Sequence, residues 1–359
     1  MEKGGLPMYT LPQKVLELTP YAPIVGEMRI RMDANESCFP LPEELRAGVR
    51  SRLEGVELRR YPDPYAVECC RLAARYYGVR EDQIVAGSGL DEILSLLSYT
   101  LLPKGAKAAF FREDFSMYAF YNALAELTPV ALGKRADLTV DVEGTAAAIC
   151  REGAEMFVFS NPCNPTSLLL GSGEVERLIR SVPALVVVDE AYMEFSGDSV
   201  LGLIDRYENL LVLRTCSKAV GLAGARLGFA MGNTRLITAL KAVKSPYNVN
   251  ALTQAAAAAV LSKPEYIDRC AQEMASFTRA LAEEIRRIGG EYPAHIGKVY
   301  DTRTNFVYLE APRSAEISSR LAQQGIAVRR MEGHLRVSTG LPEENAQFLA
   351  ALREIFSSL

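Results

Sequence analysis

The sequence predicts an α/β fold, in which a large domain with a mainly parallel sheet flanked by helices is joined to a smaller α+β domain. From about residue 45 to 245, apolar strand patterns alternate with amphipathic helix patterns, as is typical of a parallel sheet covered on both faces. From residue 304 the pattern changes to two amphipathic helices and three short strands, at 305–309, 326–330 and 335–338. At 359 residues the chain also exceeds one typical hydrophobic core, so two domains are expected.

Prolines and glycines that interrupt the helix and strand patterns predict where these domains begin and end. We expect residues 1–44 to form an N-terminal arm that joins the small domain, 45–245 to form the large domain, and 246–359 to form the small C-terminal domain. Pro246 precedes a long helical stretch that runs to Ile288 and is followed by two glycines.

Composition describes an ordinary globular protein and argues against several classes of function. Hydrophobic residues make up 49% of the chain, and the formal net charge of −4 is dispersed, with no basic stripe for nucleic acid. No apolar run approaches the roughly 20 residues that span a bilayer, and no signal-peptide pattern is visible. Seven unpatterned cysteines are typical of reduced thiols, so we expect a cytoplasmic protein that binds neither membrane nor nucleic acid.

Histidine is scarce, which limits the possible chemistry. The chain has two histidines, His295 and His334, and both are far in sequence from the strands that end in an acid. This argues against a Ser-His-Asp hydrolase and against a histidine-rich metal site. We therefore expect no metal.

Residues 209–228 place Lys218 between a buried-strand pattern and a glycine-rich bend. Thr215 and Ser217 precede the lysine, and Arg226 follows the bend. A lysine amine attacks a carbonyl only when its pKa is lowered and its position fixed, and a phosphorylated aldehyde cofactor needs hydroxyls and an arginine nearby. This layout predicts that Lys218 binds pyridoxal phosphate. The alternative is an exposed loop lysine, which is the commoner case for any single lysine.

Two more apolar strands end in polar residues that suit the same cofactor. Residues 184–192 read as a buried parallel strand with Asp189 at its C-terminal end, where open α/β sheets bind ligands, so the carboxylate can hold a pyridine nitrogen protonated. Residues 155–166 stop at two Asn-Pro pairs, which present Asn161 and Asn164 on a stiff loop. Asn164 can donate to the phenolate oxygen of the cofactor. Taken alone, Asp189 could simply cap the next element, and an Asn-Pro pair indicates only a turn.

A fourth signal lies upstream, at residues 83–97. A short strand, a Gly-Ser-Gly turn and an amphipathic helix follow one another there, so that backbone amides at a helix N-terminus face an anion. A Gly-x-Gly turn before a helix is weak by itself. The four signals in this order are much more specific than any one of them.

With these motifs the chain resembles the fold-type I pyridoxal-phosphate enzymes, and within them the histidinol-phosphate aminotransferases. The likeness covers nearly the whole chain. Besides the segments above, it includes Leu-Thr-Pro-Tyr-Ala-Pro at 18–23, Met-Asp-Ala-Asn-Glu at 32–36, Arg-Tyr-Pro-Asp-Pro at 60–64, Leu-Arg-Val-Ser-Thr-Gly at 335–340 and Glu-Asn at 344–345.

The resemblance implies a role for each matching residue. Lys218 would carry the cofactor, Asp189 would pair with the pyridine nitrogen, and Asn164 and Tyr192 would contact the ring oxygen. Phe115 falls where the family usually has a tyrosine stacked on the ring. The residues expected around the cofactor phosphate are Ser88, Gly89, Leu90, Asp91, Thr215, Ser217 and Arg226. Lys218, Asp189 and Tyr192 form the expected catalytic group.

The resemblance also implies substrate contacts. Arg336 matches the family's anion-binding arginine and Arg329 matches a second one, because a planar guanidinium fits a carboxylate or a phosphate. Arg330 is adjacent, and strand side chains alternate between faces, so one of Arg329 and Arg330 is expected to be solvated. Tyr21 and Asn35 complete the expected substrate contacts.

A homodimer with shared active sites is implied as well. Tyr61, in the Arg-Tyr-Pro-Asp-Pro turn, would reach the phosphate of the cofactor in the neighbouring subunit. The partners expected are therefore a second copy of the chain, a small-molecule amino donor and a 2-oxo acid acceptor.

The reaction implied is a transamination in two half-reactions. The amino donor displaces Lys218, which then moves a proton from the substrate α-carbon to the cofactor, and a 2-oxo acid, expected to be 2-oxoglutarate, accepts the amino group in the second half. We expect histidinol phosphate as the donor, in histidine biosynthesis. One arginine fork, Arg336, would accept the carboxylate of one substrate and the phosphate of the other.

Other interpretations stay open. The chain departs from the family pattern at 37–40, Phe115, Ser167 and Ala225, so an aromatic aminotransferase or a phosphothreonine decarboxylase on the same fold is possible. A catalytically idle regulatory paralogue belongs to a different class. The presence of Lys218, with Asp189 and Asn164, and the expected lack of a DNA-binding extension argue against this last interpretation.

Overall fold

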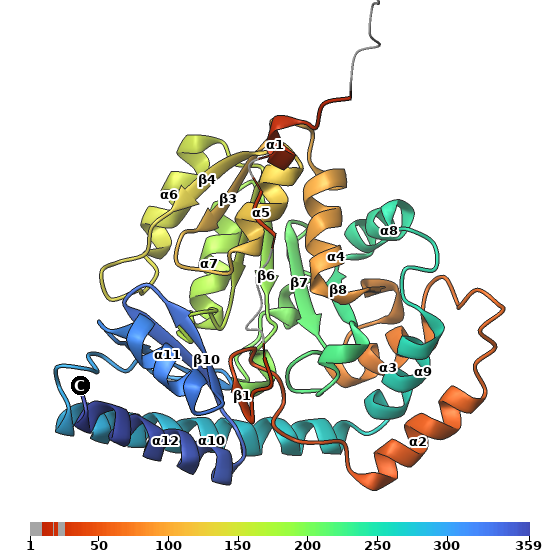
Figure 1. The fold of residues 1–359 in the computed structure, drawn as a ribbon. Helices are drawn as coiled ribbons and strands as arrows, with labels where there is room; N and C mark the ends of the chain where they lie inside the picture. Colours follow the sequence, from red (N-terminus) through yellow and green to blue (C-terminus); the bar gives the residue numbers. More distant parts are fainter. Residues whose placement is uncertain (1–8, 17, 21–25) are drawn as a thin grey trace, which may run out of the picture.

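Two sheets of different size organise the chain in the computed structural model, which describes residues 9–16, 18–20 and 26–359 (Figure 1). The larger sheet has seven strands in the order β2-β8-β7-β6-β5-β3-β4. Its strands are β2 (Ile84–Gly87), β3 (Lys107–Phe111), β4 (Thr128–Leu132), β5 (Met156–Ser160), β6 (Leu185–Asp189), β7 (Leu210–Thr215) and β8 (Gly228–Gly232).

This sheet is parallel apart from β8, as the alternating pattern predicted. β8 pairs antiparallel with both β2 and β7, whereas the pairs from β4 across to β7 are parallel. In the register of the central strands, Ser160 is opposite Asp189, and Asp189 is opposite Leu213. The loops that follow β5, β6 and β7 therefore leave the sheet side by side.

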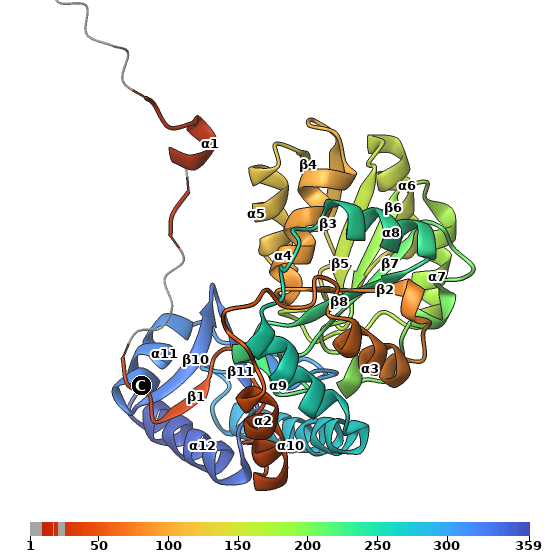
Figure 2. The ribbon, with the colours of Figure 1, turned by 90° about the vertical axis from the view of Figure 1, so that its right-hand side faces the viewer.

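Helices cover both faces of the large sheet. Alternate residues of β6 show this, because Val186 and Val188 belong to one buried cluster with α3, α6 and α7, while Val187 belongs to another with α4, α5 and α8. Helices α4 and α5 lie on one side of the sheet and α7 lies on the other (Figure 2). The helices of this part are α2 (Glu43–Glu54), α3 (Val67–Tyr77), α4 (Gly89–Leu96), α5 (Met117–Leu124), α6 (Val142–Glu152), α7 (Ser172–Ser181) and α8 (Thr234–Val243).

The smaller sheet has four strands in the order β1-β10-β11-β9. β1 pairs parallel with β10, and the other pairs are antiparallel. Its strands and helices are β1 (Ile30–Met32), β9 (Phe306–Glu310), β10 (Ile326–Met331), β11 (His334–Ser338), α11 (Ser314–Gln323) and α12 (Pro342–Ser357). The three strands predicted at the C-terminal end are confirmed to within one residue at each end, and the N-terminal arm supplies the fourth.

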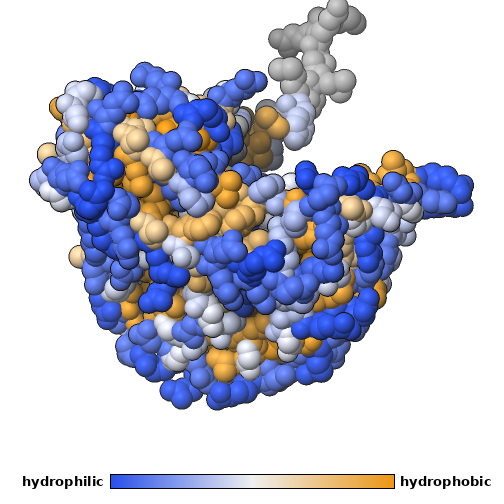
Figure 3. Space-filling model, turned by 90° about the horizontal axis from the view of Figure 1, so that it is seen from below, coloured by the Kyte–Doolittle hydropathy of each residue, from blue (hydrophilic) through white to orange (hydrophobic). Residues whose placement is uncertain are grey.

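One long helix joins the two cores. Helix α10 (Pro264–Glu291) buries Ile267 and Met274 in the core of the large sheet and Ile285 and Ile288 in the core of the small one. It runs along the base of the molecule in Figure 1, and from below the surface on this side is largely hydrophilic with apolar patches between (Figure 3).

The long helical stretch predicted after Pro246 is two helices. Helix α9 (Ala251–Leu261) ends before Pro264, which begins α10 because proline suits the first turn of a helix. Residues of α9 pack in the core of the large sheet, and Ile30 and Met32 of the arm pack in that of the small one. The domain boundaries drawn at 44 and 245 stay a prediction.

Short helix α1 (Gln13–Leu16) lies against α5, where Lys14 Nζ donates to Leu124 O at 2.9 Å. Across the part of the chain that the structure describes, no helix is long and apolar enough to cross a membrane. The same residues contain no group of three or more His, Cys, Asp or Glu side chains that could hold a metal ion.

Candidate active site

Lys218 lies just beyond β7, and its amine faces the arm of the small sheet. Its Nζ donates to the carbonyl oxygen of Ala34 at 2.9 Å and lies 5.9 Å from the centre of the Tyr192 ring. Burial, followed by the positive charges of Arg336 and Arg226, lowers the pKa of Lys218 to about 8. An amine with a pKa this close to neutrality is partly unprotonated at physiological pH and is therefore a nucleophile.

Asp189 ends β6 at the same edge of the sheet, and its side chain is buried. Its Oδ2 accepts a hydrogen bond from the Tyr118 hydroxyl at 2.8 Å, and its Oδ1 accepts one from the Ala191 backbone at 3.1 Å. Burial raises the pKa of Asp189 to about 7 in spite of these two donors. No lysine or arginine in the described residues forms an ion pair with this carboxylate, so it suits a protonated ring nitrogen.

Asn164, which follows β5 of the larger sheet, meets Arg336 of the smaller sheet. Arg336, on β11, donates from Nη1 to Asn164 Oδ1 at 2.6 Å and from Nη2 to the carbonyl oxygen of Asp33 at 2.7 Å. Its guanidinium also lies over the Phe306 ring, 5.4 Å from the ring centre. The predicted ring-oxygen donor and the predicted anion-binding arginine are thus adjacent.

Tyr192 is held by the arm. Asn35 Nδ2 donates to the Tyr192 hydroxyl at 2.9 Å, and Ser338 Oγ donates to Asn35 Oδ1 at 2.9 Å. The Tyr192 ring packs edge-on against Phe306, with 5.3 Å between the ring centres. Asn35 is buried and adopts a positive φ of 53°. In this arrangement its direct effect is to orient the tyrosine.

The predicted phosphate residues gather where α4 begins. Gly89 has φ +80°, and a Cβ there would lie 2.7 Å from Arg226 Nη2, so the turn leaves room for the guanidinium. Arg226 Nη2 also donates to Asp91 Oδ2 at 3.0 Å. The guanidinium is therefore held beside the N-terminus of α4, which attracts an anion.

Three other contacts shape the turn before α4 and the loop after β7. The Ser88 backbone N–H donates to Glu92 Oε2 at 2.6 Å, so the turn is fixed by its own helix. On the facing loop, the Ser217 backbone N–H donates to Thr215 Oγ1 at 3.1 Å. Gly228 packs closely on this turn, because a Cβ there would lie 3.0 Å from the backbone nitrogen of Leu90. Glycines, hydroxyls and one arginine together fit a phosphate group.

The remaining predicted residues are Tyr61, Arg329 and Tyr21. Tyr61 is 81% exposed, and its ring stacks on Tyr247 with 4.5 Å between the centres. Arg329 is directly opposite Arg336 in the β10–β11 register, so these two side chains share a face of the sheet and Arg330 points to the other. Tyr21 lies outside the described residues.

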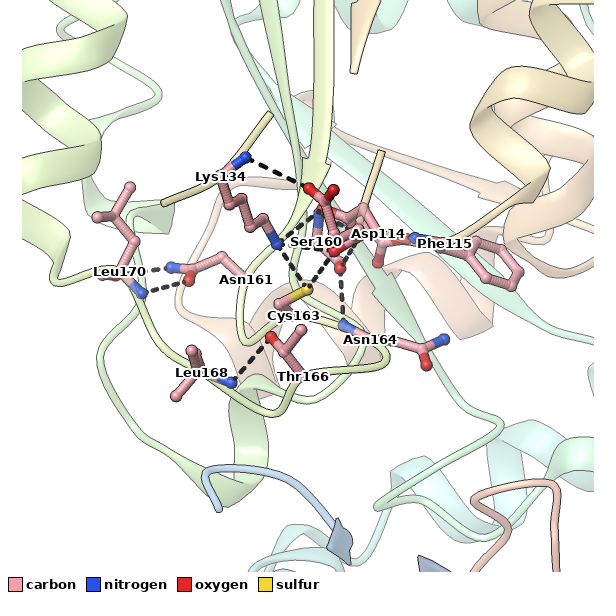
Figure 4. Close-up of polar contacts among 12 residues, drawn as sticks. Asp114, Phe115, Lys134, Ser160, Asn161, Cys163, Asn164, Thr166, Leu168 and Leu170 are labelled. Carbon is pink, nitrogen blue, oxygen red and sulfur yellow. Dashed lines mark hydrogen bonds and ion pairs between the residues drawn. The ribbon is translucent and has the colours of Figure 1, made fainter. Parts of the chain in front are cut away.

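Sequence reasoning missed several contributors. Tyr118 donates to Asp189, while Asp33, Ser338 and Phe306 surround Arg336 and Tyr192. The ring of Phe115 packs edge-on against that of Tyr118, with 5.6 Å between the ring centres. The side chains of Phe115 and Asn164, which lie in different loops, point in the same direction (Figure 4). Tyr118 lies in α5, and its contact with Asp189 depends on the order of the strands, so no local sequence signal could have found it.

A cavity of about 780 Å³ lies elsewhere, between α3 and the start of α10, and none of the predicted site residues that the structure describes lines it. Its buried cation, Arg214, is bonded to Glu190 at 2.8 Å and to Glu194 and Ser199 at 3.0 Å each. Arg214 is therefore already paired with two carboxylates, and the predicted site residues gather around Lys218 instead.

Known proteins share this fold and most of its length. Residues 27–352 match the family model for aminotransferase class I and II. A histidinol-phosphate aminotransferase from Caldanaerobacter subterraneus subsp. tengcongensis is 35% identical over 92% of this chain and 93% of its own. Another from Chromobacterium violaceum is 36% identical over 91% of this chain and 92% of its own.

Among solved structures, histidinol-phosphate aminotransferase from Sinorhizobium meliloti in complex with pyridoxal-5'-phosphate has a TM-score of 0.85 and 25% identity, covering 97% of this chain and 98% of that one. The likeness confirms the predicted fold class. It also confirms the predicted cofactor, pyridoxal phosphate, whose chemistry fits a lysine of lowered pKa beside a buried acid.

The electrostatics of Lys218 give a pH-dependent prediction. Replacing Arg336 with Gln removes a positive charge that disfavours the protonated amine, so the pKa of Lys218 should rise. The rate at which the cofactor-free protein reacts with pyridoxal phosphate should then reach half its maximum at a higher pH than the value of about 8 for the native chain. Arg329→Gln, on the same sheet face, is the control and should leave this midpoint unchanged. An unchanged or lower midpoint in Arg336→Gln would contradict the account.

Proposed function

The chain belongs to the aminotransferase class I and II family, and from this premise we propose that it transfers the amino group of histidinol phosphate to 2-oxoglutarate. The observation that carries the proposal is the meeting of Lys218, Asp189 and Arg336 at one edge of the large sheet. Relatives at 35–36% identity that are named histidinol-phosphate aminotransferases support this substrate.

Pyridoxal phosphate, when bound, supplies an electron sink for negative charge at the substrate α-carbon. Lys218 would hold the cofactor aldehyde, Asp189 would pair with the ring nitrogen, and the turn at Gly89 with Arg226 would hold the phosphate. Asp189 is suited to this role because it is buried and forms no ion pair with a lysine or arginine among the described residues, so its carboxylate can take a positive partner.

Lys218 also provides the base of the reaction. When its Nζ is not attached to the cofactor, an amine with a pKa of about 8 can take a proton from the substrate α-carbon and release it again near neutral pH. The Ala34 carbonyl at 2.9 Å and the Tyr192 ring keep this amine at the edge of the sheet. The lysine therefore serves both binding and proton transfer.

Arg336 recognises the anionic end of each substrate. Its fork of N–H donors matches two oxygens whether a carbon or a phosphorus atom carries them, so one residue can accept both the carboxylate of the acceptor and the phosphate of the donor. Arg329, opposite it on the same sheet face, is a second cation that substrates of this charge would meet. Two arginines on one face favour doubly charged substrates over monocarboxylates.

We also propose a homodimer with shared active sites in the cytoplasm. Tyr61 is 81% exposed. The apolar or aromatic residues Leu58, Tyr65 and Val67 at nearby sequence positions are exposed too, and so is Tyr247, on which the Tyr61 ring stacks. Lys244 supports this loop, since its Nζ donates to the carbonyl oxygen of Pro64 at 2.6 Å. A stiff loop with an exposed tyrosine can enter the site of a second copy.

Steady-state kinetics test the substrate. With 2-oxoglutarate as acceptor, kcat/KM for histidinol phosphate should exceed that for phenylalanine or tyrosine. Arg336→Lys keeps the charge and loses the fork, so it should lower kcat/KM for histidinol phosphate and glutamate alike, by roughly tenfold or more. The control Arg330→Lys, which points to the other sheet face, should change neither. A native preference for phenylalanine or tyrosine would reject histidinol phosphate and leave the aminotransferase class intact.

Subunit mixing tests the shared site. Tyr61→Phe and Lys218→Ala each damage a different half of the site, so a heterodimer of the two contains one undamaged site. If both variants are inactive alone and subunits exchange freely, a 1:1 mixture should recover about a quarter of native activity, because half of the dimers are mixed and each has one good site. Tyr99→Phe, a change at another exposed tyrosine, is the matched control and should be active alone. No recovery after verified exchange would show that each site is built within one chain.

A further inference from the structure

A buried carboxylate, Asp114, joins two loops beside the active site. Its Oδ1 accepts hydrogen bonds from the Ser160 hydroxyl and from the Phe115 backbone at 2.7 Å, and its Oδ2 accepts one from the Ser160 backbone at 3.2 Å (Figure 4). Ser160 is the last residue of β5, whereas Asp114 lies in the loop that follows β3. The carboxylate therefore ties the ends of two neighbouring parallel strands together.

A buried lysine compensates the charge of this carboxylate. Lys134 Nζ lies 4.0 Å from Asp114 Oδ2, and the two side chains are 3% and 1% exposed. The same ammonium donates to the carbonyl oxygen of Glu113 at 2.9 Å and to Cys163 Sγ at 3.0 Å. Burial raises the pKa of Asp114, and the charge of Lys134 opposes this rise. Desolvation of both charges is costly, and the hydrogen bonds that each group makes to its neighbours help to offset it.

The hydrogen bonds continue from Asp114 to the site. Ser160 Oγ donates to Asp114 and in turn accepts the backbone N–H of Asn164 at 2.9 Å. Asp114 is also covalently adjacent to Phe115, whose backbone N–H it accepts. Phe115 and Asn164 thus depend on the same carboxylate, although they lie in different loops.

We propose that Asp114 is a positioning residue, which acts through Ser160 to hold Asn164 and Phe115 in fixed relation to each other at the cofactor ring. The proposal rests on the roles given above to Phe115 at the ring face and Asn164 at the ring oxygen. Both residues have to be placed accurately, because the ring must be stacked and its oxygen hydrogen-bonded at the same time. A shift of about 1 Å in such a group is enough to lower a rate about a hundredfold.

Ser160→Ala tests the link most cleanly, because it breaks the connection to Asn164 and leaves the Asp114–Lys134 pair in place. The matched control is Ser98→Ala, which also removes a buried serine hydroxyl bonded to a side chain, that of Asn122 at 3.1 Å. Both variants are compared with the native protein, each as the full chain loaded with pyridoxal phosphate.

Three measurements should separate Ser160→Ala from its control. The pH midpoint of the visible absorption band should rise by about half to one unit, because a donor to the ring oxygen is displaced. Hydrogen–deuterium exchange should quicken at residues 161–168, and kcat should fall about tenfold. If Ser160→Ala matches Ser98→Ala in all three, the proposal is wrong.

A second variant removes Asp114 itself. Asp114→Asn alone would leave the buried ammonium of Lys134 without its counter-charge and lower stability. It is therefore combined with Lys134→Met, so that both charges are removed. The pair of changes should shift the band midpoint and lower kcat in the same direction as Ser160→Ala. Native values in the folded double variant would overturn the proposal. The band and the exchange are independent of substrate, so a failure with histidinol phosphate would reject the proposed function without deciding this one.

Discussion

The common edge at which parallel strands end is the constraint on which this site depends. Because β5, β6 and β7 run in the same direction and in register, Ser160, Asp189 and Thr215 end their strands at that edge. The loops that follow carry Asn164, Tyr192 and Lys218, so residues distant in the sequence are brought together by the sheet. The N-terminal arm then adds Asn35, and β11 of the smaller sheet adds Arg336.

Burial sets the chemistry at this edge. It lowers the pKa of Lys218 to about 8 and raises that of Asp189 to about 7, because a low-dielectric environment disfavours the charged form of either group. The amine thereby becomes nucleophilic, while the charged form of the carboxylate requires a positive partner to be stable. Both consequences match what an aldehyde cofactor with a basic ring nitrogen requires, and neither depends on a metal.

Much of the fold and the centre of the site could be predicted from the sequence. A continuous apolar run indicates a buried parallel strand, and such runs end in Asp189 or precede Lys218. The structure brings both residues to one edge of the sheet. Tyr118 and Asp114 were missed because their partners, Asp189 and Ser160, are set by strand order and not by spacing. Likewise, only the β10–β11 register decides that Arg329, and not Arg330, shares a face with Arg336.

The most direct test of the account is to find which lysine holds the cofactor. The loaded protein is reduced with borohydride, digested, and its peptides are weighed by mass spectrometry. The account predicts one peptide carrying the reduced cofactor, with the added mass on Lys218. Attachment to another buried lysine, such as Lys134 or Lys244, would contradict the site described above.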